Sequence, residues 1–131
     1  MKKSKIVFWL LGIIIGGVII FYSVGIYRVV FSPYVYNYFH RVEFDSKRWK
    51  NWTETIDEPS LRWHMIHDLE TDYELLGKTR FEIIDLLGKP NYESENKIRY
   101  YLGMSGHGID TGTLFFKLKN DIIIDYYVLR G

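Results

Sequence analysis

The chain has 131 residues, a formal charge of +1 and no cysteine. This length suits one modest domain beside an N-terminal apolar stretch, and the lack of cysteine excludes disulfides, thiol catalysis and cysteine-ligated metals. Because Lys2, Lys3 and Lys5 precede the apolar stretch, the remainder carries 14 basic residues against 16 acidic ones. Phosphate binding needs a basic surface, so this balance argues against nucleic acid as a partner.

Residues 6–27 form an apolar stretch without a charged residue. A helix of this length measures roughly 33 Å, against roughly 30 Å of bilayer hydrocarbon. We therefore predict a single-pass helix in the cell membrane, with the basic tail at 1–5 in the cytoplasm and the domain outside. A cleaved signal peptide would have a shorter apolar core and a small-residue cleavage site, and a soluble core helix is rarely apolar all round.

Gly12 and Gly16 lie four residues apart within this stretch. Such spacing lets two membrane helices approach closely, because neither glycine has a side chain. The pair therefore suggests a homodimer, or an accessory subunit that acts through its membrane helix.

Residues 28–58 show no clean period and are expected to form a juxtamembrane connector. Pro33 argues against a helix running through it. The aromatic residues of 34–39 are expected at the membrane interface or on the domain. Phe44, Trp49 and Trp52 are expected to dock on the core.

Two short helices are expected next, within a domain at 59–131. The first begins at Pro59 and ends at Leu76-Gly77. One apolar face is predicted for it, formed by Leu61, Met65, Ile66 and Leu69.

The second helix has the clearest boundaries in the chain. Thr79 and Glu82 have the spacing of a capping box, and Gly88 followed by Pro90 ends the helix. Its apolar stripe is expected from Phe81, Ile83, Ile84 and Leu87.

The period then changes to two residues, which is typical of strands. Strands are expected at 98–102, 113–118 and 122–129, with a loop at 103–108 and a tight hairpin turn at Asn120-Asp121. The predicted fold is α+β, in which a transmembrane helix precedes two short helices packed on a three-stranded antiparallel sheet.

The order of motifs in residues 60–129 resembles the SmpA/OmlA, or BamE-like, envelope protein family. The resemblance lies in Leu76-Gly77-Lys78-Thr79, Leu86-Leu87-Gly88-Lys89-Pro90, Arg99-Tyr100-Tyr101-Leu102 and Phe115-Phe116-Lys117. It implies a two-layer fold outside the cytoplasm and a binding role without catalysis, and the fold is also similar to the repeat of β-lactamase inhibitory proteins. Family members are held by a lipidated N-terminal cysteine, which this chain lacks, so their role in barrel assembly is not carried over.

Histidines suggest an alternative as a small metal-dependent or hydrolytic enzyme. His64 and His67 lie three residues apart on the first predicted helix, and His107 follows Ser105 and precedes Asp110. Two histidines can ligate a metal, but polar residues on a solvated helix face are the simpler interpretation. A catalytic triad needs an oxyanion hole and partners from separate elements, so a mobile loop better explains 103–108.

We therefore expect a non-catalytic, membrane-tethered protein-interaction module of the cell envelope, with no cofactor and no metal. Its partners are the lipid bilayer and another envelope protein. The expected contact residues are exposed aromatics of the connector and two residues of the loop: Tyr34, Tyr36, Tyr38, Phe39, Met104 and His107.

Overall fold

The computed structural model describes residues 2–106 and 108–131. The chain divides into two compact units, Met1–Tyr36 and Asn37–Gly131.

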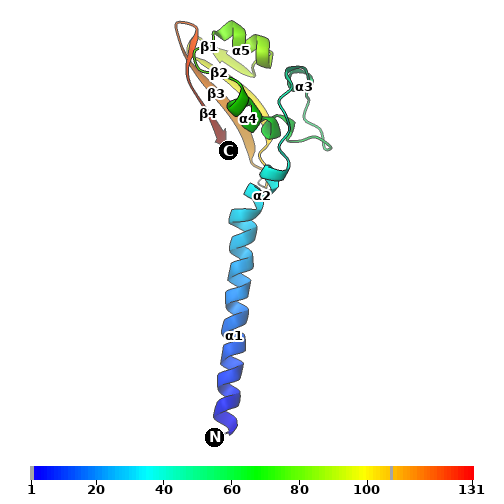
Figure 1. Cartoon of the computed structure of the whole chain (residues 1–131), viewed down its shortest axis with the longest axis vertical. Helices are drawn as coiled ribbons and strands as arrows, with labels where there is room; N and C mark the ends of the chain where they lie inside the picture. The colour runs from blue at the N-terminus through cyan, green and yellow to red at the C-terminus, as the bar shows by residue number, and fades with distance from the viewer. Residues whose placement is uncertain (1, 107) are drawn as a thin grey trace. The chain divides into compact units, whose positions relative to one another are not determined.

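The first unit is helical. It contains α1 (Lys2–Ile26), the π-helical turn η1 (Tyr27–Phe31) and the first residues of α2 (Ser32–Phe39), drawn in blue and cyan in Figure 1. The stretch Ser4–Phe31 is long and apolar enough to span a membrane or act as a signal anchor, with a mean hydropathy of 2.5. The structure therefore confirms the predicted apolar helix in its length and composition.

The helix does not stop before Pro33, contrary to the prediction. Proline has no N–H, and its ring clashes with the carbonyl four residues earlier in a regular α-helix. Here η1 precedes α2, and the N–H of Ser32 reaches back five residues to the carbonyl of Tyr27. A π-helical turn changes the pairing just where Pro33 would disturb it, so the chain stays helical.

Most of the predicted connector belongs to the second unit. Its short helix α3 (Ser46–Asn51) is capped by Asp45, whose side chain accepts a hydrogen bond from the N–H of Arg48. Phe44 and Trp49 are buried in the core, as the sequence predicted, and Trp52 packs against it. The domain therefore begins near residue 37 rather than 59, because these aromatic side chains complete its core.

The helix α4 (Leu61–Asp72) begins two residues after Pro59. Its predicted apolar face is confirmed, since Leu61, Met65, Ile66 and Leu69 are all buried. It ends at Asp72, four residues before the predicted end.

The helix α5 (Arg80–Leu87) has the predicted capping box, in which the N–H of Thr79 donates to Glu82 Oε2 at 2.7 Å. Gly88 ends it with a φ of +79°. The predicted stripe is wrong in one position: Ile83 and Leu87 are buried, but Phe81 is 78% exposed. In so short a helix, residues four apart share the core-facing side, and Phe81 precedes Ile83 by only two positions.

The sheet has four strands rather than the predicted three. They are β1 (Tyr92–Ser94), β2 (Lys97–Met104), β3 (Thr111–Lys119) and β4 (Ile122–Arg130), paired antiparallel in the order β1-β2-β3-β4. The strand β1 is too short to show an alternating pattern. The hairpin turn is confirmed: Asn120 and Asp121 have φ values of +52° and +61°, as a type I′ turn requires.

We call the face of the sheet that packs against the helices the inner face. In Figure 1, α4 lies across this face, next to β2. The inner face buries alternate side chains of β2, β3 and β4: Ile98, Tyr100, Leu102, Leu114, Phe116, Leu118 and Ile123. The domain is thus a two-layer α+β fold.

Two glycines of the sheet allow this close packing. A Cβ on Gly103 would clash with the carbonyl oxygen of Pro59, and one on Gly112 would clash with the ring of Trp63. The N–H of Met104 bonds to the carbonyl of Pro59 at 2.9 Å. The predicted loop at 103–108 is therefore wrong at its start, because β2 continues to Met104.

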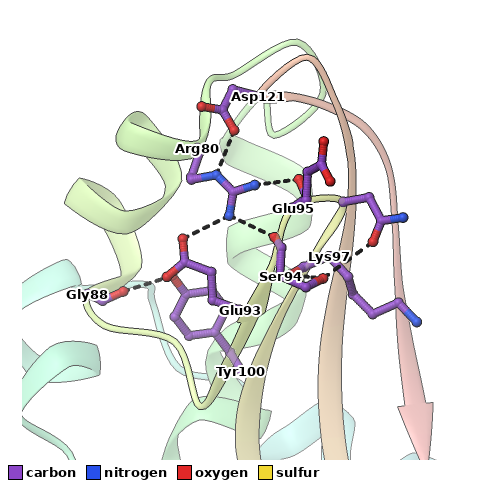
Figure 2. A network of polar contacts seen from close by, with 9 residues as sticks. Arg80, Gly88, Glu93, Ser94, Glu95, Lys97, Tyr100 and Asp121 are labelled. Atoms are coloured by element: carbon purple, nitrogen blue, oxygen red, sulfur yellow. Dashed lines mark hydrogen bonds and ion pairs between the residues drawn. The ribbon is translucent and has the colours of Figure 1, made fainter.

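Arg80 connects α5 to both turns at one end of the sheet (Figure 2). Its guanidinium forms ion pairs with Glu93 at 2.8 Å and Asp121 at 2.7 Å. It also donates to the carbonyls of Ser94 and Glu95, at 3.0 and 2.6 Å. The hydrogen bond to Asp121 and the other contacts raise the pKa of Arg80, so this residue is a fixed positive charge that holds three segments together.

Candidate interaction surface

The predicted aromatic contact residues are all exposed, but they do not belong to one unit. Tyr34 and Tyr36 lie in the first unit, whereas Tyr38 and Phe39 lie in the second. The rings of Tyr38 and Phe39 meet edge to face at 5.5 Å, and the guanidinium of Arg41 lies 4.8 Å from the Tyr38 ring. Within the domain, the structure therefore groups two of these four residues.

The two loop residues have different outcomes. Met104 is half-buried at the end of β2, where it pairs with Thr111. His107 lies outside the described residues. Ser105 is fully buried, and its hydroxyl donates to the carbonyl of Asp110 at 3.1 Å, so this serine is part of the turn itself.

The two histidines of α4 have different environments. His67 is exposed, as expected, but His64 is half-buried, and its ring centroid lies 5.8 Å from that of His40. Burial, and then the nearby charge of His40, lowers the pKa of His64. Within residues 2–106 and 108–131, no group of three or more His, Asp or Glu side chains is placed to hold a metal ion.

Gly12 and Gly16 lie on α1 with open space around them. The side of the helix at Gly12 forms a shallow groove lined by Phe8, Trp9, Gly12 and Ile13. This arrangement has the shape that a second helix needs for close approach.

The face of the sheet opposite the core, which we call the outer face, carries a row of aromatic and cationic side chains. The row follows the strand register from Tyr92 through Arg99 and Phe115 to Tyr127. Phe115 and Tyr127 stack at 5.0 Å with nearly parallel rings. The Arg99 guanidinium lies 4.2 Å from the Tyr92 ring and 5.9 Å from the Phe115 ring. We call these four residues the aromatic row.

The next row along the strands is cationic. Lys97 is the register partner of Lys117, which pairs in turn with Asp125. An ion pair of 2.8 Å joins Lys117 to Asp125; its hydrogen bond raises the pKa of Lys117 and lowers that of Asp125. Lys119 lies two residues further along β3. We call Lys97, Lys117 and Lys119 the lysine cluster.

A cleft of about 350 Å³ lies elsewhere in the domain, bordered by α3 and α5. Lys50, Lys78, Glu82 and Asp85 line it with both signs of charge, beside the exposed Phe81. This mixture favours no particular charge on a ligand, so the outer face is the better candidate site.

Comparisons with family models, curated proteins and solved structures find no match for this chain. The resemblance to the SmpA/OmlA family therefore stays a prediction.

The outer face was not predicted as a site, although part of its signal is in the sequence. Alternation along β3 places Phe115, Lys117 and Lys119 opposite the core residues. The sequence does not show which residues of the other strands lie beside them. Register alone brings Arg99 and Tyr127 next to Phe115.

Proposed function

We propose that this chain is a membrane-tethered, non-catalytic protein-interaction module of the cell envelope. The outer face of the sheet is the observation that carries the proposal, because it presents aromatic and cationic groups on a rigid scaffold. Aromatic residues and arginine are enriched in protein–protein interfaces. The resemblance to binding proteins of the envelope supports the same role.

We propose that Ser4–Phe31 spans the cytoplasmic membrane and places the domain outside the cytoplasm. Lys2 and Lys3 precede the span and Lys5 lies at its start, against Arg28 near its other end. An excess of lysine and arginine marks the cytoplasmic side of a membrane helix.

Photocrosslinking in native membranes tests the interaction role. Benzoylphenylalanine replaces Leu129, which is 51% exposed and lies on the outer face beside Thr113. A matched probe replaces Lys89, an exposed residue after α5. We expect a discrete protein adduct from position 129 and none from position 89. The proposal fails if no outer-face position, including 92 and 127, gives a protein adduct.

A second role is favoured by the groove at Gly12. Two copies of the chain would associate through Gly12 and Gly16, or the helix would bind another membrane helix. Energy transfer between labelled chains in bilayers tests the homodimer. Gly12→Leu with Gly16→Leu should abolish transfer, whereas the control Gly25→Leu should retain it, because Gly25 lies off the GxxxG spacing. Equal transfer in all variants would exclude association through these glycines.

A further inference from the structure

We infer that the outer face binds an acidic, extended polypeptide segment with an apolar side chain next to its carboxylates. This inference rests on the proposed function and names the partner's chemistry. Three features of the outer face support it: a like-charge pair, a local excess of positive charge and a matching spacing.

The like-charge pair is Lys97 and Lys117, which lie directly opposite each other on β2 and β3. Like charges at such positions destabilise a sheet. Lys119 adds a third positive charge nearby, whereas Asp125 is the single acid in this row. A carboxylate from a partner would relieve this repulsion, so the cluster favours an acidic ligand.

The excess of positive charge is local. Residues 37–131 hold 13 basic and 16 acidic residues, so the domain as a whole is acidic. On the paired rows of the outer face, Lys97, Arg99, Lys117 and Lys119 stand against Asp125 alone. A ligand attracted by charge would therefore be directed to this face rather than to the helical layer.

The spacing matches an extended peptide. Lys119, Lys117 and Phe115 occupy successive outward positions of β3, which lie roughly 7 Å apart along a strand. Alternate side chains of an extended peptide have the same spacing. A segment with two acids at alternate positions and then an apolar residue can place one carboxylate on Lys119, the other between Lys117 and its register partner Lys97, and its apolar side chain on the aromatic row.

The shape of the aromatic row favours a polypeptide over a lipid surface. Phe115 and Tyr127 are half-buried and lie nearly parallel, with an interplanar angle of 8°. Arg99 lies between Tyr92 and Phe115 rather than projecting from the sheet. Membrane insertion uses projecting apolar side chains. Ile122 and Leu129 are exposed near the two ends of β4, but the flat row between them suits stacking against a bound side chain.

Two labelled peptides test the inference with the full chain in phosphatidylcholine nanodiscs. One is Ser-Glu-Ser-Glu-Ser-Phe-Ser, and the other has glutamine in place of both glutamates. Fluorescence anisotropy at low salt should show that the glutamate peptide binds about tenfold more tightly, since two exposed ion pairs are gained. Added salt should reduce this preference.

Paired lysine variants locate the contact. Lys97→Gln with Lys119→Gln should weaken binding of the glutamate peptide about tenfold. The matched control, Lys47→Gln with Lys89→Gln, removes two exposed lysines outside the outer face and should leave binding unchanged. Unfolding midpoints of both variants, measured alongside, separate lost binding from lost folding.

Benzoylphenylalanine in place of Ile122, the register partner of Lys119, identifies the occupant. With peptide and phosphatidylglycerol both present, a peptide adduct supports the inference, and a lipid adduct overturns it. Equal binding of the two peptides, or unchanged binding by the Lys97/Lys119 variant, also overturns it. If a protein adduct still forms at position 129 in native membranes, the proposed function stands and only the acidic chemistry is wrong.

Discussion

The inner and outer faces of the sheet are built from alternate residues of the same strands, yet they differ in burial and in charge. On β3, Leu114, Phe116 and Leu118 are buried against the helices. Phe115, Lys117 and Lys119 point the other way and remain half-buried or exposed. Folding is stabilised on the inner face by the removal of apolar surface from water, whereas on the outer face Lys97 lies opposite Lys117 and the repulsion between them opposes folding. Aromatic content alone therefore does not identify the core.

Neighbouring phenylalanines of β3 test this comparison most strongly. Phe116→Ala should lower the free energy of unfolding by about 3–5 kcal/mol, because it leaves a cavity in the core. Phe115→Ala should cost about 1 kcal/mol, mostly through the lost stacking with Tyr127. Denaturant unfolding of the full chain, followed by tryptophan fluorescence, measures both. Equal losses would mean that the outer face is also part of the core.

Glycine substitutions test how closely the helical layer approaches the inner face. Gly103→Ala should destabilise the domain by about 2–4 kcal/mol, through its φ of +82° and a clash with Pro59. Gly77→Ala, at a φ of +78° but in open space, should cost about 1 kcal/mol. The difference between the two unfolding energies isolates the steric contribution. This difference would vanish if the helical layer could move away from the sheet without lowering the stability of the domain.

Removing the Arg80 side chain tests how the edges of the two layers are joined. Arg80→Ala should lower the free energy of unfolding by about 1–2 kcal/mol, because the side chain is only 17% exposed and bonds to both turns. Arg48→Ala removes an ion pair with Glu58 that is about half exposed and should cost about 0–0.5 kcal/mol. Thermal unfolding of both variants measures the contrast. Similar midpoints would show that the network in Figure 2 contributes little.

The smallest expected effect concerns the lysine cluster. Lys97→Gln removes one member of the like-charge pair and should raise the free energy of unfolding by about 0.3 kcal/mol. Lys117→Gln also removes the ion pair with Asp125 and should lower the free energy of unfolding slightly. Opposite shifts in denaturant midpoint are the expected result. A lower free energy of unfolding in both variants would show that Lys97 does not oppose folding.

Local patterns predicted much of the fold. The apolar helix, the capping box at Thr79 and the hairpin turn at Asn120 each depend on residues that are close in sequence. Their physical causes act within a few positions: hydrophobic length, side-chain to backbone hydrogen bonds and positive φ. The structure confirms each of them.

Two features that depend on distant partners were missed, and so was one local change in hydrogen bonding. β1 has three residues and becomes a strand only because β2 pairs with it. Phe81 was predicted to be buried, but the orientation of α5 leaves it exposed. The helix through Pro33 depends on a change of hydrogen-bond pattern that hydrophobicity does not indicate.

Local sequence is enough to specify the apolar N-terminal helix, the α+β class and the alternation of the main strands. Tertiary packing alone leaves Phe81 exposed and brings Tyr92, Arg99, Phe115 and Tyr127 into one row. The reason is physical. Helix and strand patterns depend on residues that are close in sequence. A surface assembled across four strands depends on register, which the packing of the whole domain sets.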